Sequence, residues 1–506
     1  MKRSAAYLLS MVIFFVSASA SADAPPTDAA ISQWVNTAIK LDPRMGTGDI
    51  TASTTNGVVT LFGNADNLVE RHFAALEAKK IKGVRAIINR IQLNRIRRPD
   101  TDIANLVRDR ILTSGTLTAG QIGVAVHGGE VMLTGKAQSN AQKQAAGVLA
   151  GEVSGVVAVN NQIMVDDPST RPDAQILKDV QTNLRLDVYL AEEPIQASVK
   201  NGVVTLEGFV SSPYLIERAR ADVYIIRNVV DLRNQLQVDW EKKYTGREHE
   251  ITPPDFELVR AIEDVLLLDQ RMLLSDHITV QARQGHVTLQ GTVPNYRQHD
   301  LAGRDAGQVV GVAWVTNSIQ VTAAPRPDPA ISHDIWANLQ NDRILHGDAI
   351  KVQVLAGKVQ LQGSVPSYFD KAQAEADAAR VPGILAIDNA LVVHPQIAID
   401  DQALKEHILA RIAGNWAISP VLKNITVTLE DGRAVLKGQV RTWQQRREAG
   451  RMAILTRGVL AIDNRLTVQG VNYHWDNWYD EKANALYYNP NGERDRDLNP
   501  AADRWE

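Results

Sequence analysis

One arrangement of apolar and polar positions returns six times along the chain. In the second copy, apolar residues at the i, i+3, i+4, i+7 spacing over residues 102–112 predict an amphipathic helix. Ile122, Val124 and Val126 then alternate with smaller or polar residues, which is the period of a half-buried strand. A glycine pair, Gly128-Gly129, precedes a second alternating run, and this combination predicts a β-hairpin.

The second half of each copy predicts one more helix and one more strand. Residues 139–153 are rich in Ala and Gln, and Gly155 follows them as a helix C-terminal glycine would. A short valine-rich run with Asn161 then predicts a third strand. A strand that is reached through a helical crossover lies parallel to another strand of its sheet. We therefore predict an α+β fold class: a tandem array of six small α-β-β-α-β domains, each a three-stranded mixed sheet with two helices on one face.

The six copies share fixed positions: an Ile, a Gly seven residues later, a Leu, a second Gly and a late Asn. The sets are Ile50/Gly57/Leu61/Gly63/Asn89, Ile122/Gly129/Leu133/Gly135/Asn161, Ile195/Gly202/Leu206/Gly208/Asn234, Ile278/Gly285/Leu289/Gly291/Asn317, Ile350/Gly357/Leu361/Gly363/Asn389 and Ile425/Gly432/Leu436/Gly438/Asn464. We expect the second glycine to end the second strand and to allow a close backbone approach. The repeated Asn either satisfies local backbone groups or lies on an exposed face and binds a ligand, and the first reading is favoured.

These positions set the domain boundaries. We expect repeats at residues 28–94, 100–166, 172–238, 255–322, 328–394 and 400–468, with a linker at 239–254 that suggests a hinge between the third and fourth repeats. The C-terminal tail, residues 471–506, matches no repeat and is rich in Trp and Tyr. It either packs on the array or forms a contact surface, and packing is favoured.

The N-terminus predicts export. Lys2 and Arg3 precede an apolar run over residues 5–16 and a small-residue segment that ends at Ala22. This is the pattern of a cleavable signal peptide at residues 1–22, with an uncleaved membrane anchor as the less favoured alternative. The chain has no cysteine, so a lipid-modified N-terminal cysteine and disulfides are both excluded. We expect a periplasmic protein that is not a lipoprotein.

Composition narrows the class of partner. A hydrophobic share of 44% and a charged share of 22% indicate an ordinary globular protein, and 506 residues exceed what one core accommodates. Without residues 1–22, 52 basic residues face 58 acidic ones. This acidic balance argues against generic nucleic-acid binding.

The repeat resembles a known domain. The pattern Ile-x-Val-x6-Gly-x-Val-x-Leu-x-Gly, followed about twenty residues later by Gly-Val and Val/Ile-x-Asn, is similar to the BON domain of bacterial envelope proteins, and the resemblance covers residues 28–468. The family is named for an osmotically induced periplasmic protein and for nodulation proteins. The resemblance implies an α-β-β-α-β sandwich, an exported location and a non-enzymatic role in phospholipid or envelope-protein interaction. The third copy departs from the pattern with Asn228 at the Gly position, which left-handed geometry tolerates.

No catalytic constellation emerges from the sequence. No nucleophile elbow, phosphate-binding loop or zinc-protease motif is present, and the histidines fall at different repeat positions. We expect no enzyme activity, no cofactor and no metal.

A basic group in the sixth repeat is the candidate lipid-binding site. It consists of Arg441, Trp443, Arg446, Arg447 and Arg451, of which Trp443, Arg447 and Arg451 share one face of the second helix. A cationic face with an interfacial Trp suits anionic lipid headgroups. The bland alternative is a solvated basic face.

Two functional hypotheses follow. The leading one is a scaffold or stress-protective factor that binds anionic phospholipid surfaces or envelope proteins. The alternative is a periplasmic chaperone that holds unfolded exported client proteins. Only lipid binding through basic side chains should weaken sharply with ionic strength.

Overall fold

The computed structural model describes residues 25–469, except for 47–48, 95–97, 114–121, 166–170, 240–252, 273–276, 343–344, 346–348 and 395–399. The predicted signal peptide at 1–22 and the aromatic tail at 471–506 lie outside these residues. Every structural statement below concerns the described part of the chain.

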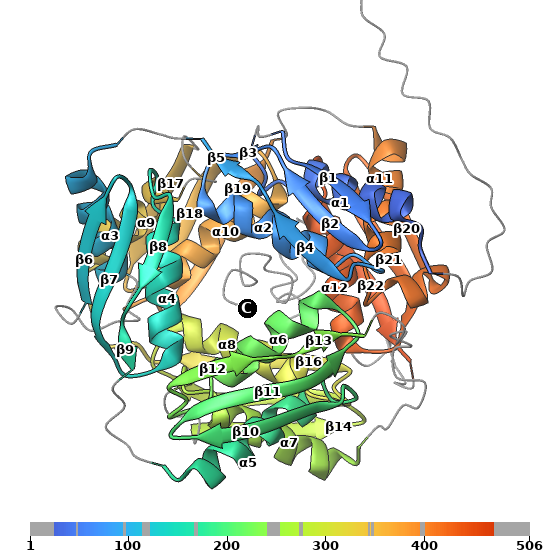
Figure 1. Ribbon diagram of the computed structural model, residues 1–506. Coiled ribbons are helices and arrows are strands. Elements are labelled where there is room, and N and C mark those ends of the chain that lie inside the picture. The colour runs from blue at the N-terminus through green and yellow to red at the C-terminus, as the bar shows by residue number, and fades with distance from the viewer. Residues whose placement is uncertain are drawn as a thin grey trace, which may run out of the picture.

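The six repeats, here called domains 1 to 6, follow one element order (Figure 1). The first helices are α1 (Asp28–Leu41), α3 (Asp100–Thr113), α5 (Asp173–Leu186), α7 (Asp255–Leu268), α9 (Asp328–Asn341) and α11 (Asp401–Gly414). The hairpins are β1 (Thr51–Thr55) with β2 (Val58–Phe62), β6 (Ile122–His127) with β7 (Glu130–Ala137), β10 (Ile195–Lys200) with β11 (Val203–Val210), β14 (Ile278–Arg283) with β15 (His286–Val293), β17 (Ala349–Leu355) with β18 (Lys358–Val365), and β20 (Ile425–Glu430) with β21 (Arg433–Val440).

The second half of each domain adds a helix and a third strand. The second helices are α2 (Leu68–Lys79), α4 (Asn140–Gly151), α6 (Pro213–Tyr224), α8 (Tyr296–Gln308), α10 (Tyr368–Ala379) and α12 (Trp443–Ile454). The third strands are β4 (Ala86–Asn89), β8 (Ala158–Asn161), β12 (Asp231–Asn234), β16 (Trp314–Val321), β19 (Ala386–Val393) and β22 (Ala461–Val468). Short pieces complete the set: β3 (Asn64–Ala65) pairs with β5 (Gln92–Leu93), while β9 (Met164–Val165), β13 (Gln237–Val238) and the 3-10 helix η2 (Ser419–Asn424) extend domains 2, 3 and 6.

Each sheet is mixed, as predicted. In domain 6, β20 pairs antiparallel with β21, and β21 pairs parallel with β22, so that Leu436 lies opposite both Val427 and Asn464. Val427 and Leu436 are buried beneath the helices, whereas alternate residues such as Thr426 and Lys437 are exposed on the other face. The prediction of an α+β array with two helices on one face of each sheet is confirmed.

The repeated Asn is structural. In domain 2, Asn161 Nδ2 donates to the Lys143 carbonyl at 2.6 Å, and Asn161 Oδ1 accepts from the Ile163 N–H at 3.3 Å. The same two bonds recur at Asn89, Asn234, Asn317, Asn389 and Asn464. Each Asn therefore ties the third strand to the second helix, which confirms the favoured reading.

The second glycine allows a close backbone approach, as expected. A Cβ built on Gly363, which has a φ of +128°, would lie 1.9 Å from the Ala349 carbonyl oxygen. The expectation that this glycine ends the strand is confirmed in domain 1, where β2 ends at Phe62, directly before Gly63. It is wrong in the other domains, as in domain 5, where β18 continues to Val365 and keeps its parallel pairing with β19. Asn228 adopts a φ of +65°, which is the left-handed geometry expected at that position.

An aspartate that sequence reasoning did not single out opens every first helix. Asp28 Oδ2 accepts from the Asn56 N–H at 2.7 Å, and Asp28 Oδ1 accepts from the Gly57 N–H at 2.8 Å. Equivalent bonds join the hairpin turns to Asp100, Asp173, Asp255, Asp328 and Asp401. The signal was present in the sequence, since each Asp precedes the first glycine of its repeat by 29 to 31 residues.

The domains associate in three pairs through their first helices: α1 contacts α11, α3 contacts α9, and α5 contacts α7. Backbone bonds cross two of these pairs. The Lys82 N–H donates to the Gly414 carbonyl at 2.8 Å between domains 1 and 6, and the Val188 N–H donates to the Gln308 carbonyl at 3.0 Å between domains 3 and 4. Domains 3 and 4 also share one apolar core. The suggested hinge between them is therefore replaced by a packed interface.

A second type of contact joins domains 1, 2 and 3 into one closed layer and domains 4, 5 and 6 into another. We call the closed assembly of the two layers the ring. The first turn of each second helix reaches the next domain in the order 1 to 2 to 3 to 1, and 4 to 5 to 6 to 4. The contacts are Leu68 with the core of domain 2, Asn140 with the Val229 and Val230 carbonyls, Ser212 with the Lys79 carbonyl, Tyr296 with the core of domain 5, Tyr368 with Ile454, and Trp443 with Trp314. The chain thus reproduces the arrangement of a symmetric hexamer built from three dimers.

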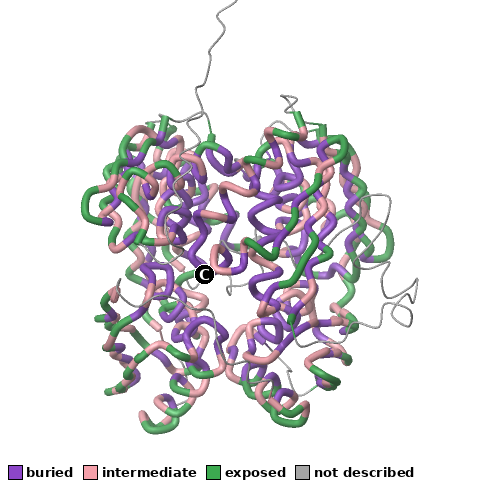
Figure 2. Tube along the Cα trace, turned by 90° about the vertical axis from the view of Figure 1, so that its right-hand side faces the viewer, coloured by how far each residue is buried: buried purple, intermediate pink, exposed green. Residues whose placement is uncertain are grey.

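The views agree with this arrangement. Figure 1 shows the three pairs around a common centre, with the second helices on the inner side. Figure 2 shows the two layers edge-on, with buried segments gathered where the helices pack and exposed segments along the outer rim. Within the described residues, no helix combines the length and apolar character needed to span a bilayer.

Candidate functional site

The predicted lipid-binding group lies on and just before α12. Thr442 caps this helix by accepting from the Gln445 N–H at 3.1 Å, which fixes the direction of the first turn. Trp443, Arg446 and Arg451 are buried, with 1%, 5% and 5% of their surfaces exposed. The structure therefore does not bring all five predicted residues together on one accessible face.

Trp443 and Arg446 join domain 6 to domain 4. The Trp443 ring packs against Trp314 in an edge-on contact, with 4.8 Å between ring centroids. The Arg446 guanidinium lies 4.6 Å from the Trp314 ring centroid and 4.7 Å from that of Trp443. Arg446 also donates to the carbonyls of Asn464 and Leu466. The cation and the aromatic ring thus stabilise a contact between domains.

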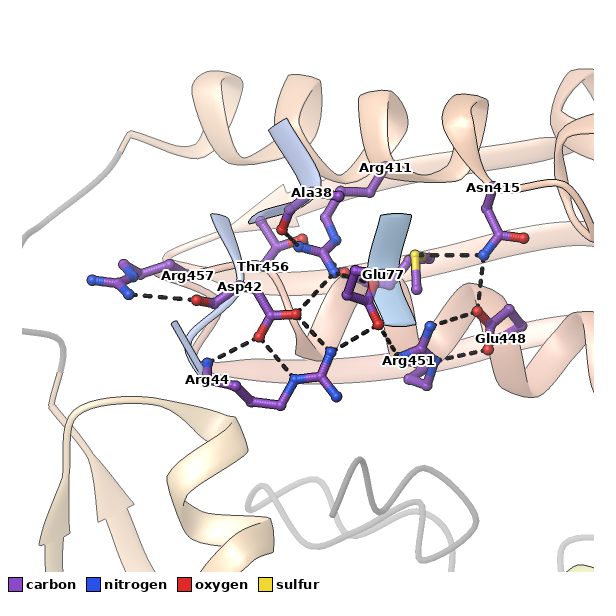
Figure 3. Close-up of polar contacts among 11 residues, drawn as sticks. Ala38, Asp42, Arg44, Glu77, Arg411, Asn415, Glu448, Arg451, Thr456 and Arg457 are labelled. Carbon is purple, nitrogen blue, oxygen red and sulfur yellow. Dashed lines mark hydrogen bonds and ion pairs between the residues drawn. The ribbon is translucent and has the colours of Figure 1, made fainter. Parts of the chain in front are cut away.

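Arg451 joins domain 6 to domain 1. Its Nη1 lies 3.1 Å from Glu77 Oε1 on α2, and its Nη2 lies 2.7 Å from Glu448 Oε1 on α12. Figure 3 shows Arg451 and Glu77 at the centre of a continuous network between the two domains. We call Asp42, Arg44, Glu77, Arg411, Glu448 and Arg451 the closure network.

The closure network is largely buried and balanced in charge. Arg44 Nη2 lies 2.7 Å from Asp42 Oδ2 and 2.8 Å from Glu77 Oε1, with no exposed surface on the Arg44 side chain. Arg411 reaches across from domain 6 and donates to the Ala38 carbonyl at 2.8 Å. Three arginines thus face three carboxylates, which is the condition under which buried charges are tolerated.

The protonation of Glu77 follows from these neighbours. Burial by itself raises the pKa of the Glu77 carboxyl, but the cations Arg451 and Arg44, with Lys80 and Arg411 behind them, outweigh that effect. The pKa of Glu77 therefore lies well below its usual value, and the carboxylate stays charged in the closed ring.

The other two predicted residues remain nearer the surface. Arg441 and Arg447 are half-buried. Arg441 directly follows β21 and lies four residues after Lys437, so the alternation of the strand places both on the outward side of the sheet. Lys437 lies opposite Arg465 of β22 in the parallel register, and both are exposed. We call Lys437, Arg441 and Arg465 the outer basic patch.

Sequence reasoning named only one member of this patch among its candidate residues. Lys437 and Arg465 lie 28 residues apart on different strands, so no helical spacing relates them. Their pairing becomes visible only once the strand register is known. Like charges that lie directly opposite on a sheet repel one another. Arg465 is partly neutralised by Asp463 at 2.7 Å, and this ion pair is largely solvated on the arginine side.

Apolar side chains are also exposed on the outward faces. Phe62 and Ile88 lie on domain 1, Met132 and Met164 on domain 2, and Phe209 on domain 3, with 37% to 61% of each surface exposed. Much of the helix surface is used in contacts between domains, although Phe256, Leu267 and Trp336 on first helices are also exposed. The outward sheet faces are a repeated surface that remains open to a partner.

The described residues hold no group of three or more His, Asp or Glu side chains arranged to bind a metal ion. The buried ionisable side chains of the closure network contact one another and lie at a domain interface. The expectation that the chain is not an enzyme remains a prediction.

Comparison with known proteins agrees with the repeat pattern. A sequence model of the BON domain matches residues 27–95, 99–167, 172–239, 254–323, 327–395 and 400–470. Osmotically-inducible protein Y of Escherichia coli (strain K12) is 33% identical over 132 residues, which cover 25% of this chain and 66% of that relative, just under two thirds of its length.

Among solved structures, the C-terminal domain of CdsD, a structural protein of the type III secretion system of Chlamydia trachomatis, aligns over 45% of this chain and 100% of its own. The identity is 14% and the TM-score 0.12, values that carry no argument. Six family matches cover most of the sequence and coincide with the six folded units. The chain belongs to the BON domain family, as a protein with six tandem copies.

Proposed function

We propose that the protein is a non-enzymatic, exported protein of the cell envelope that binds anionic phospholipid surfaces and acts there as a scaffold or stress-protective factor. Membership of the BON domain family and the osmotically inducible relative support a role in the envelope under osmotic stress. The pattern of residues 1–22 supports export to the periplasm.

The outer basic patch is the observation that carries the lipid proposal. It places three cationic side chains on one exposed sheet face, where Lys437 lies directly opposite Arg465. A basic side chain close to an anionic membrane contributes about 1 kcal/mol. Lys437 and Arg441 therefore provide roughly 2 kcal/mol, and Arg465 adds less because Asp463 partly neutralises it. This suits reversible attachment that needs support from other contacts.

The buried members of the predicted lipid-binding group stabilise contacts between domains in this proposal. Trp443, Arg446 and Arg451 hold domain 6 against domains 4 and 1 and cannot reach a membrane while the ring is closed. Arg441 and Arg447 retain accessible surface. Lipid binding by this domain thus requires the outward sheet face.

Co-sedimentation with vesicles tests the proposal. The protein without residues 1–22 is mixed with neutral or anionic vesicles at low and high salt. Binding to anionic vesicles alone, weakened by salt, is the expected result. Replacing Lys437 and Arg441 by Glu should weaken it by roughly 30-fold or more, since about 2 kcal/mol is removed.

A matched control keeps the same change of charge elsewhere. Lys178 and Arg185 are exposed on α5 of domain 3, away from the outward sheet face. Replacing both by Glu should leave most of the binding intact. Equal losses of vesicle binding in the two variants would show that binding depends only on net charge and would contradict a specific role of the outer basic patch.

The alternative function, a periplasmic chaperone for unfolded exported clients, draws on a different observation. Apolar side chains are exposed on the outward faces, and Met164 and Leu355 reach 61% and 79% exposure. Suppression of client aggregation that is insensitive to salt, without vesicle binding, would favour this function.

A further inference from the structure

The first strand of each domain lies at the edge of its sheet. On such a strand, the N–H and C=O groups of alternate residues point away from the neighbouring strand and need another partner. In domain 1 both groups of Ala52 are satisfied by Asn36 of α1. The Ala52 N–H donates to Asn36 Oδ1 at 2.7 Å, and Asn36 Nδ2 donates to the Ala52 carbonyl at 3.0 Å.

Domain 2 protects its edge with the equivalent helix residue. Arg108 is eight residues after the Asp that opens α3, as Asn36 is in α1. Its Nη2 donates to the carbonyl of Val124 at 3.2 Å. The eighth residue after the repeated Asp is thus the position from which the first helix reaches the strand edge.

In domain 5 this position holds Trp336. Its indole has one N–H donor and no acceptor, so it cannot reproduce the paired bonds of Asn36. The side chain is 54% exposed, which is unusual for so large an apolar group. Val352 is the equivalent of Ala52, because it pairs with Leu361 as Ala52 pairs with Leu61. Within the described residues, no hydrogen bond reaches the outward groups of Val352.

The remaining domains lack this combination. The equivalent residues are the exposed Gln181 in domain 3, the exposed Glu263 in domain 4 and the half-buried Leu409 in domain 6. A polar or charged side chain beside an edge strand discourages pairing with another chain. Only domain 5 places a large exposed aromatic ring there. The strand is also long, since β17 covers Ala349–Leu355.

We propose that the β17 edge of domain 5 binds an extended segment of another polypeptide as an added strand, with one of its apolar side chains packed on Trp336. The outward N–H and C=O groups of Ile350, Val352 and Val354 repeat every second residue, and only an extended peptide backbone matches that repeat. Trp336 requires an apolar side chain opposite it. Lys351 and Gln353 are exposed on the outward face and favour polar or acidic residues at the alternate positions of the ligand.

The site is separate from the outer basic patch, which lies in domain 6, and does not depend on lipid binding. A substitution borrowed from domain 1 tests it. Trp336→Asn gives domain 5 the same side chain that Asn36 supplies in domain 1, so its amide can hydrogen-bond to the backbone of Val352 and occupy the edge. The substitution leaves the core unchanged, because the Trp336 side chain is exposed. Gln181→Asn makes the same side chain at the equivalent position of domain 3 and serves as the control.

The ligands are selected from a phage-displayed library of random peptides of about 12 residues, longer than a typical strand. Selection uses the protein without residues 1–22, followed by counter-selection on the Trp336→Asn variant. The proposal predicts enriched peptides in which apolar and polar residues alternate. A synthetic peptide of this set should lose roughly tenfold or more in affinity with Trp336→Asn, as for the loss of an aromatic anchor, and little with Gln181→Asn.

Hydrogen exchange supplies a readout specific to the edge. The amides of Val352 and Val354 should exchange quickly in the free protein and slow down when the peptide binds. Recovery of no binder that distinguishes wild type from Trp336→Asn would overturn the proposal. Binders that leave exchange over residues 349–355 unchanged would overturn it as well. The proposal would also be overturned if no peptide binds and the protein instead self-associates through a contact that Trp336→Asn abolishes.

Discussion

Arg451 Nη1 in the last domain lies 3.1 Å from Glu77 Oε1 in the first domain, although 374 residues of chain separate them. This contact belongs to the closure network that holds domains 1 and 6 together (Figure 3). Because of this network, the last domain contacts the first, and the six domains form a closed arrangement with an inner and an outer side. The helices supply the contacts between domains, and the sheets face outward.

Removal of Arg451 should open this interface. Arg451→Ala leaves the buried Glu77 and the half-buried Glu448 with fewer cations, and breaking a buried pair costs about 3–5 kcal/mol. The amides of Lys82 and Arg457, which donate across the interface to Gly414 and Leu41, should then exchange faster with solvent. Arg465→Ala is the control, because its ion pair with Asp463 is 47% exposed on the arginine side and is worth less than about 1 kcal/mol. Unchanged exchange in Arg451→Ala would show that the network does not hold the domains.

The same interface should weaken in acid. The pKa of Glu77 lies well below its usual value in the closed ring, and in the open chain it returns toward about 4.3. A depressed pKa contributes stability that is present above the unfolded value and is lost as pH falls through the folded value. Exchange of the Lys82 amide, corrected for intrinsic rates, should therefore rise below about pH 4. Glu77→Gln should remove most of this dependence, and a variant that keeps it would assign the acid sensitivity to other carboxyls.

Asp305 in domain 4 should show the opposite dependence. Burial, followed by the adjacent carboxylate of Asp269, raises the pKa of Asp305 well above its usual value. A raised pKa contributes stability at low pH that is lost as pH rises from about 4 through the folded value. Asp305→Asn should thus gain stability relative to wild type as pH rises toward neutrality, measured by thermal unfolding at several pH values. A constant difference in stability across that range would contradict the raised pKa of Asp305.

The second glycine of each repeat should not tolerate a side chain. Gly363→Ala places a Cβ 1.9 Å from the Ala349 carbonyl at a φ of +128°, so the hairpin must distort. We expect a loss of more than about 3 kcal/mol, the scale of combined strain and overpacking. Gly128→Ala is the comparison, because a Cβ there meets nothing within 4 Å at a φ of +56°. It should cost only about 1 kcal/mol. Similar losses in the free energy of unfolding at both sites, measured by urea unfolding, would show that the clash is not the cause of the loss.

The sequence predicted each domain well, because the signals within a domain are local. Alternation, hairpin turns and fixed glycines specify the α-β-β-α-β unit, and the local hydrogen-bonding chemistry of Asn predicts the backbone contacts that the repeated Asn makes. The repeated Asp could have been found by the same comparison, since its spacing to the first glycine is nearly constant.

The contacts between domains could not be predicted in this way. Helical spacing predicts that Trp443 and Arg451 share a face of α12, but it cannot show that Trp443 packs against domain 4 and Arg451 against domain 1. The residues that make the layer contacts change from Leu68 in domain 1 to Asn140 in domain 2 and Trp443 in domain 6, while tyrosine recurs in domains 4 and 5, so the repeat pattern does not reveal them. A helix face that would be exposed in an isolated domain is covered by a neighbouring domain in the array.

Crosslinking across the ring tests the closed arrangement most directly. Lys79 of domain 1 and Glu217 of domain 3 form an ion pair at 2.6 Å whose side chains are 25% and 18% exposed, and the chain contains no cysteine. Lys79→Cys with Glu217→Cys, treated with a short bismaleimide at low protein concentration, should give an intramolecular crosslink, and neither single variant should. The crosslink should disappear in denaturant. Its absence from the folded double variant, with both thiols shown to react separately, would contradict the closed ring.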